Sequence, residues 1–179
     1  RFMQIDQTTV RSLELERTMR SNSREGTLLG IMDQTCTAMG SRRLRQWMLY
    51  PLRDYDEIVM RQDAVELLMG RNDVVRQLRV ELKKMADMER IVSRIGTRRA
   101  SPRDIASLGE SLRELPKLIS ILSPVATQGT MLYGIVNQLS GLDELGDFIA
   151  RAIVEQPPAN VRDGGVIADS FDPELDRLR

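Results

Sequence analysis

Residues 101–122 read SPRDIASLGESLRELPKLISIL. The opening Ser-Pro-Arg-Asp supplies a capping hydroxyl, a first-turn proline and an acidic third position, which together begin a helix. Apolar residues then recur at alternating spacings of three and four, namely Ile105, Leu108, Leu112, Leu115, Ile119 and Leu122. This seam predicts a long helix that packs against neighbouring helices.

Pro116 lies inside this predicted helix. Proline lacks the backbone N–H, and its ring crowds the carbonyl of Leu112 one turn earlier, so we expect a kink there. Two further apolar stripes at helical spacing, within 132–139 and 142–152, predict shorter helices that fold back against the long one. Pro157-Pro158 ends the second stripe.

Capping residues and glycines mark the helices expected before residue 101. The sequence predicts helices over 27–33 and 37–50 and a third from Asp54 to Gly70. A fourth segment, capped by Asp73, is expected to run with a bend to Gly96. Because aromatic residues are only 4% of the chain, aliphatic helix packing is favoured over a sheet sandwich.

The expected fold class is therefore mainly α, a multi-helix bundle with a small N-terminal β-hairpin. Residues 2–15 alternate weakly around the turn-forming Asp6-Gln7-Thr8-Thr9, which favours the hairpin. Three parts are predicted: a hairpin or arm over 1–23, a helical core over 24–156, and a last part over 157–179. The last part contains the turn Asp163-Gly164-Gly165, a short strand near 165–167 and the start of a helix.

The final residues predict a helix with a beginning and no end. Asp172 is a cap, Pro173 fits the first helical position, and Glu174 favours the positive end of the helix dipole. Leu175 and Leu178 then begin an apolar stripe. This pattern leads us to expect that the sequence continues in a longer protein.

Composition argues against several kinds of site. The chain contains no histidine, so it lacks a Ser-His-Asp triad, an imidazole base and a histidine-liganded metal. None of its lysines follows a glycine, which removes the Gly-Lys-Ser/Thr phosphate loop. We expect no catalytic, cofactor or metal site. No apolar run is long enough to cross a bilayer, and the single Cys36 suits a reducing cytoplasm.

A net charge of zero conceals an asymmetry. Residues 1–103 carry 20 basic and 14 acidic side chains, whereas residues 104–179 carry 6 and 12. The basic part holds two arginine clusters. The first comprises Arg42, Arg43 and Arg45. The second, which is the stronger candidate for contact with a DNA backbone, comprises Arg94, Arg98, Arg99 and Arg103.

Both clusters also have a structural interpretation. The first fans around its predicted helix at about 100° per residue, which is typical of a solvated face with ion pairs. The second surrounds a predicted helix end, where cations complement the dipole.

A series of short motifs runs through the chain in a fixed order. The series includes Met3, Ile5, Asp6, Thr9, Arg11 and Leu13-Glu14-Leu15, then Gly26-Thr27-Leu28-Leu29, Met39-Gly40, Trp47, Pro51-Leu52, Asp63-Ala64-Val65, Ala100-Ser101-Pro102-Arg103-Asp104, Leu115-Pro116 and Asp163-Gly164-Gly165-Val166-Ile167. This order resembles the core domain of the MutS family of DNA mismatch-repair proteins. Arg43 departs from the pattern, which usually has an apolar residue there.

The resemblance implies a core with long lever-like helices, joining mismatch-reading and connector domains to a clamp and an ATPase domain. It implies coupling between DNA binding and ATP state. It assigns structural or coupling roles to Asp6, Arg11, Gly40, Trp47, Pro51, Pro102, Leu112 and Pro116.

ATP and Mg²⁺ would then belong to the full-length protein. Its partners would be mismatched duplex DNA, a second MutS subunit and a MutL-type protein, in the cytoplasm and away from membranes.

Two other classes stay open. A helical scaffold or protein-interaction module with non-specific DNA affinity explains the apolar seams but not the ordered motifs. A stand-alone helical DNA-binding domain explains the basic part, although the zero net charge argues against it.

Overall fold

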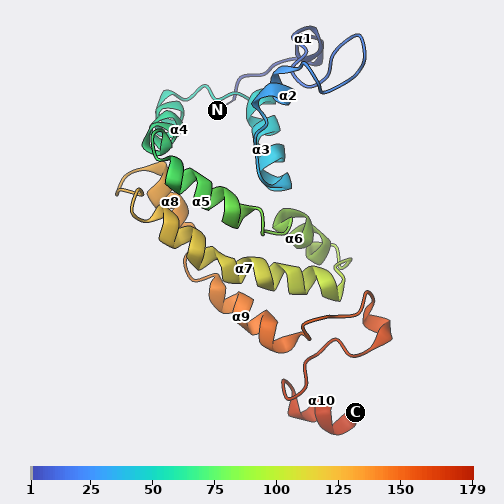
Figure 1. The fold of residues 1–179 in the computed structure, drawn as a ribbon. Coiled ribbons are helices and arrows are strands. Elements are labelled where there is room, and N and C mark those ends of the chain that lie inside the picture. The colour runs from blue at the N-terminus through green and yellow to red at the C-terminus, as the bar shows by residue number, and fades with distance from the viewer. Residues whose placement is uncertain (1) are drawn as a thin grey trace. The chain divides into compact units, whose positions relative to one another are not determined.

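The computed structural model describes residues 2–179 and is mainly helical (Figure 1). The helices form two compact units, one ending at Asn72 and the other spanning Asp73–Arg179. Within the described residues, extended segments meet only as two isolated bridges, between Phe2 and Leu52 and between Ile153 and Ile167.

The first unit consists of short helices that begin at side-chain caps. Its helices are α1 (Gln7–Ser12), α2 (Leu28–Met32), α3 (Ala38–Leu49) and α4 (Tyr55–Leu68). In each case the capping side chain accepts a hydrogen bond from the backbone N–H three residues later, and the caps are Asp6, Thr27, Thr37 and Asp54. The helices predicted over 27–33, 37–50 and from Asp54 are present.

The predicted N-terminal β-hairpin is wrong. The supposed turn is the start of α1, because the Asp6 carboxylate accepts bonds from the Thr9 backbone N–H at 2.9 Å and from its hydroxyl at 2.7 Å. This local cap outweighs the weak apolar alternation. Phe2 pairs with Leu52 instead of a neighbouring strand, and the Met3 N–H donates to the Pro51 carbonyl at 2.7 Å.

The second unit is organised around its longest helix, α7 (Pro102–Leu122). The other elements are α5 (Asn72–Leu82), α6 (Met88–Gly96), α8 (Met131–Leu139), α9 (Asp143–Ala152), the 3-10 turn η1 (Val161–Asp163) and α10 (Pro173–Leu178). Helix α7 contacts α6, α8 and α9 (Figure 1).

The segment predicted as one bent helix over 73–96 is two helices. α5 begins at Asn72 with Asp73 in its first turn and ends at Leu82. The chain then leaves the helical path, and Asp87 caps α6 by accepting from the Arg90 N–H at 3.3 Å. Asp87 is a second start signal within a continuous apolar stripe, and it separates the two helices.

The core of the second unit lies along the α7 seam. Its buried members are Ile91, Leu108, Leu112, Leu115, Leu118 and Ile149. Leu115 is the most enclosed of the α7 leucines, with 2% of its surface exposed. Complete burial of such a side chain contributes about 1.5–3 kcal/mol. The predicted seam is confirmed at Leu108, Leu112, Leu115 and Leu122, whereas Leu118 is buried where the pattern favoured Ile119.

Pro116 lies on the exposed side of α7, and the helix continues through it to Leu122. Because Pro116 has no backbone N–H, the carbonyl of Leu112 lacks the donor that it would have in a regular helix.

Near the C-terminus, the predicted short strand is a single bridge. The Val154 N–H donates to the Val166 carbonyl at 3.1 Å, and the Ala168 N–H donates to the Ala152 carbonyl at 2.9 Å. α10 follows, capped by Asp172 with Pro173 in its first turn, as predicted.

Candidate functional site

Two glycines allow α7 and α9 to meet backbone to backbone. A Cβ atom on Gly109 would lie 2.6 Å from Cγ2 of Ile149, and one on Gly146 would lie 2.9 Å from the carbonyl oxygen of Gly109. A larger residue at Gly146 would collide with the α7 backbone, and one at Gly109 would collide with the Ile149 side chain of α9. Glycine weakens a helix by about 1 kcal/mol relative to alanine, so close packing accounts for glycine at both positions.

Side chains on either side of the glycine contact also connect α7 with α9. Ile149 enters the buried core below the glycines. On the exposed side, Nε of Arg113 lies 2.9 Å from a carboxylate oxygen of Asp147. That pair is solvent-exposed and contributes little energy. The alignment of α7 and α9 therefore rests on the glycine contact and the core.

A buried hydroxyl ties α7 to the link between α5 and α6. The Ala86 N–H donates to Oγ of Ser111 at 2.9 Å, and that hydroxyl donates to the Ser107 carbonyl at 2.8 Å. Ser111 is 2% exposed, so water cannot replace these bonds. This link, α7 and α9 consequently form one packed body inside the second unit.

The structure separates the second arginine cluster into two pairs with different roles. Nη2 of Arg94 donates to the Asp104 carboxylate at 2.6 Å. Nε of Arg103 donates to the Pro157 carbonyl at 3.1 Å. Both therefore serve the folded structure. Arg98 and Arg99 are exposed in the turn between α6 and α7.

Asp104 is strongly held at the start of α7. Its carboxylate accepts the Ser101 N–H at 2.9 Å, while the Asp104 N–H donates to Oγ of Ser101 at 3.2 Å. The pKa of Asp104 is lowered, first by the Ser101 backbone bond and then by the Ser101 hydroxyl and Arg94. The predicted capping box is thus confirmed.

Arg98 and Arg99 share a hollow with a residue distant in sequence. The hollow, of about 520 Å³, is lined from the turn by residues 98–102 and from the η1 region by residues 159–163. The latter stretch contributes Arg162, which the sequence did not single out. Arg98 has φ +55°, the left-handed conformation.

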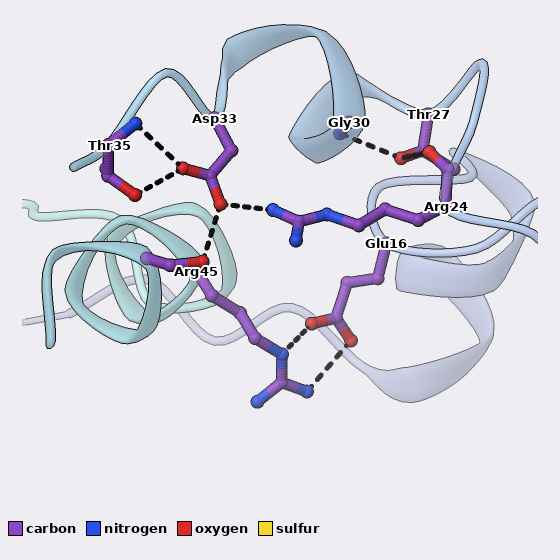
Figure 2. Close-up of polar contacts among 8 residues, drawn as sticks. Glu16, Arg24, Thr27, Gly30, Asp33, Thr35 and Arg45 are labelled. Atoms are coloured by element: carbon purple, nitrogen blue, oxygen red, sulfur yellow. Dashed lines mark hydrogen bonds and ion pairs between the residues drawn. The ribbon is translucent and has the colours of Figure 1, made fainter. Parts of the chain in front are cut away.

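The first arginine cluster is engaged within its own unit. Arg45 donates from Nη2 to the Glu16 carboxylate at 3.0 Å, as Figure 2 shows. Arg43 donates from Nη1 to Oε1 of Gln46 at 3.1 Å. The ion-pairing interpretation therefore describes Arg45.

Asp33 gathers several donors nearby in the first unit. Its carboxylate accepts the Thr35 N–H at 3.1 Å, the Thr35 hydroxyl at 2.6 Å and the Ser41 hydroxyl at 2.5 Å. Arg24 completes the set as an ion pair (Figure 2). These donors, Ser41 foremost, hold the pKa of Asp33 far below its ordinary value. The cluster joins the loop before α2 to α3.

The other residues of the first unit that were assigned structural or coupling roles differ in their contacts and exposure. The guanidinium carbon of Arg61 lies over the Trp47 ring, 4.0 Å from the centre of that ring. A Cβ on Gly40 would lie 3.1 Å from Oγ1 of Thr37, so this glycine fits closely against the cap of its helix. Arg11 is exposed at the end of α1. Asp6 and Pro51 have the capping and bridging contacts described above.

Sequence reasoning missed the residues that fix the second unit most tightly. Gly109 interrupts an apolar helix without ending it, and such a glycine is a signal of close packing. Nothing local identifies Gly146 as its partner. Ser111 is likewise polar within the seam, and its acceptor role depends on Ala86, far away in sequence.

The described residues contain neither a metal-binding cluster nor a membrane-spanning helix. No group of three or more Asp, Glu, Cys or His side chains within residues 2–179 is arranged to hold a metal ion. None of the helices in this range is long and apolar enough to span a membrane.

Comparison with known proteins gives consistent relatives. The family model described as MutS domain III matches residues 8–177. The DNA mismatch repair protein MutS of Salinibacter ruber is 39% identical over 175 residues, covering 98% of this chain and 19% of that protein. The MutS of Methanothrix thermoacetophila is 39% identical over 180 residues, covering 99% and 21%.

The MutS of Myxococcus xanthus is 37% identical over 174 residues, covering 97% of this chain and 19% of that protein. This chain thus spans about a fifth of the length of these relatives. The family match extends from α1 to α10 and includes the glycine crossing, the Ser101 capping box and the turn between α6 and α7. The chain therefore belongs to the MutS domain III family.

Proposed function

We propose that this chain is the structural core of a MutS-type mismatch-repair protein and couples DNA binding to ATP state in the full-length protein. The backbone contact of Gly109 with Gly146 carries the proposal. Transmission between distant sites requires elements that move as units. A helix pair in backbone contact and sealed by a leucine core meets that requirement.

The side chains available in this chain determine which functions we assign to it and which to other parts of the full-length protein. The chain has no histidine and no Gly-Lys-Ser/Thr loop, so we assign ATP, Mg²⁺ and hydrolysis to other parts of the full-length protein. This chain itself is proposed to be non-catalytic. α10, capped by Asp172, is proposed as the start of a lever that leads toward a clamp over DNA.

The partners are proposed at the level of the full-length protein. They are mismatched duplex DNA, a second MutS subunit and a MutL-type protein, in the cytoplasm. A generic helical scaffold has less support, because it does not account for a family match over residues 8–177.

A substitution that separates α7 from α9 tests the coupling. In the full-length protein that carries this segment, Gly109→Ala places a methyl group against Ile149. Gly134→Ala is the matched control, since a Cβ there meets nothing within 4 Å. The measurements are the rate of ATP-triggered release from a mismatched duplex, the equilibrium DNA affinity and the nucleotide affinity. Thermal melting verifies that each variant is folded.

We expect Gly109→Ala to slow ATP-triggered release about tenfold, a rise of about 1.4 kcal/mol in the barrier to release, while both affinities stay within about twofold of wild type. Gly134→Ala should match the wild type in all three. Should Gly109→Ala fold and release DNA at the wild-type rate, the crossing has no part in coupling. Ile149→Ala, which removes the Cγ2 atom that faces Gly109 and introduces no clash, provides the test if Gly109→Ala does not fold.

A further inference from the structure

The turn between α6 and α7 carries more positive charge than its surroundings neutralise. Arg98, Arg99 and Arg162 line one hollow, and Asp163 is the sole carboxylate in its lining. Within residues 2–179, the structure gives these three arginines no side-chain hydrogen bond or ion pair. Asp104, the first carboxylate of α7, already accepts hydrogen bonds from Arg94 and Ser101. Three guanidinium groups therefore face solvent around a single hollow.

The backbone at Arg98 is unfavourable for folding. The Arg98 N–H donates to the Ile95 carbonyl at 2.9 Å, and the Arg99 N–H donates to the Arg94 carbonyl at 2.8 Å. These two bonds form the Schellman arrangement at the end of α6, in which the left-handed residue is usually glycine. Here that residue is Arg98, with φ +55°. Strain retained at an exposed charged residue points to a role other than stability.

Arg162 is held beside this turn by the fold. The segment that carries it is closed at its base by the bridge between Ile153 and Ile167. Arg103, at the start of α7, also anchors that segment through the Pro157 carbonyl. Two distant stretches of sequence are thus fixed around one hollow, which reduces the conformational cost of binding a ligand there.

We propose that this hollow binds the phosphate backbone of duplex DNA through Arg98, Arg99 and Arg162. Guanidinium groups donate paired hydrogen bonds to phosphate oxygens. Such contacts position DNA without reading its sequence, so binding is the same for matched and mismatched duplexes. DNA is favoured over an acidic peptide because Val161 is the one large apolar aliphatic side chain among the lining residues, so a peptide would find little apolar surface to bury against.

The test compares two triple variants of the chain with equal loss of charge. Arg98→Ala/Arg99→Ala/Arg162→Ala removes the hollow's cations. Arg20→Ala/Arg53→Ala/Arg76→Ala removes three exposed arginines elsewhere. Binding of a fluorescent matched duplex is followed by anisotropy over a range of potassium chloride concentrations. Each phosphate contact contributes about 0.9 to the slope of log affinity against log salt, so we expect the first variant to lose about 2–3 and the control far less.

Equal slopes for the two variants would overturn the proposal, and so would a wild-type chain that does not bind the duplex at low salt. The proposal also fails if the three arginines are needed for binding to poly-glutamate but not to DNA, since that result assigns the hollow to an acidic protein. These measurements contain no nucleotide, so their outcome is independent of the coupling proposed above.

A single substitution separates binding from folding. Arg98→Gly suits the left-handed backbone and removes one cation, so we expect an unchanged or higher melting temperature with a salt slope lower by about 0.9. Arg98→Lys keeps the charge and should retain most of the slope. Arg98→Gly with wild-type DNA affinity and slope would remove Arg98 from the site.

Discussion

Gly146 on α9 faces the Gly109 carbonyl of α7 so closely that a Cβ atom on Gly146 would lie 2.9 Å from that oxygen. The same Cβ would lie 2.8 Å from Cγ of Arg113. The separation of the two helices is therefore set by backbone atoms, which cannot change rotamer to relieve a clash. Substitutions at this contact should act on the whole second unit.

Gly109→Ala should destabilise the chain by about 1–3 kcal/mol, the usual cost of overpacking. This loss would occur although alanine favours a helix by about 1 kcal/mol. Gly134→Ala, in open space on α8, should gain stability instead. Urea unfolding followed by circular dichroism measures both. A Gly109→Ala chain more stable than wild type would show that α9 moves away at no cost.

Ser111→Ala should cost about 1–3 kcal/mol, because the Ala86 N–H would lose its acceptor in a buried place. Ser120→Ala serves as the control, since Ser120 is exposed on the same helix and its hydroxyl donates only to the Lys117 carbonyl. Hydrogen exchange at Ala86 gives a local readout and should accelerate in Ser111→Ala. Unchanged exchange there would mean that another group satisfies this N–H.

Asp33→Asn should weaken the first unit by about 1.5–3 kcal/mol near neutral pH, the range for bonds to a charged group. The pKa of Asp33 is lowered in the folded state, so the folded chain binds fewer protons than the unfolded chain. Its stabilisation is full above the unfolded pKa of about 3.9 and is lost as the pH falls below that value. Unfolding at a series of pH values measures this.

In Asp33→Asn this part of the acid sensitivity should disappear. Asp63→Asn, which changes an exposed carboxylate on α4, should retain it. Identical pH profiles for Asp33→Asn and wild type would show that the Thr35, Ser41 and Arg24 contacts do not stabilise the charged form.

Pro116→Ala should leave the unfolding free energy within about 1 kcal/mol of wild type or raise it. The variant restores a backbone donor to the helix, although it also frees the unfolded chain. Leu112→Ala, in the core, should cost about 2–5 kcal/mol. In the full-length protein we expect Pro116→Ala to weaken nucleotide-dependent release from DNA more than it weakens either binding event. Wild-type release would make the proline a passive feature.

Local signals predicted the helix starts well. Ser101, Pro102 and Asp104 act within one turn of the chain, so the sequence alone contains the information needed for the cap. The prediction of an N-terminal hairpin was wrong because a local signal was overlooked. The Asp6 cap is strong, whereas the apolar alternation that suggested strands is weak. Asp87 shows that a cap within an apolar stripe can divide one expected helix into two.

Tertiary pairing accounts for what the sequence did not predict. Gly109 by itself indicates close packing, but its contact with Gly146 forms only after α9 has folded back against α7. The second arginine cluster was treated as one group because its members are close in sequence. The fold assigns Arg94 to Asp104 and Arg103 to Pro157, and it adds Arg162 from a distant loop.

The glycine contact also determines which relative motions of α7 and α9 are easy. Sliding α9 by one helical turn toward the start of α7, about 5.4 Å, would place Gly146 opposite Ile105 instead of Gly109, and that side chain would collide with the α9 backbone. Rotation about the point where the two glycines meet keeps that contact intact. The contact thus acts as a stop: it blocks a change of register between α7 and α9, which favours movement of the two helices together.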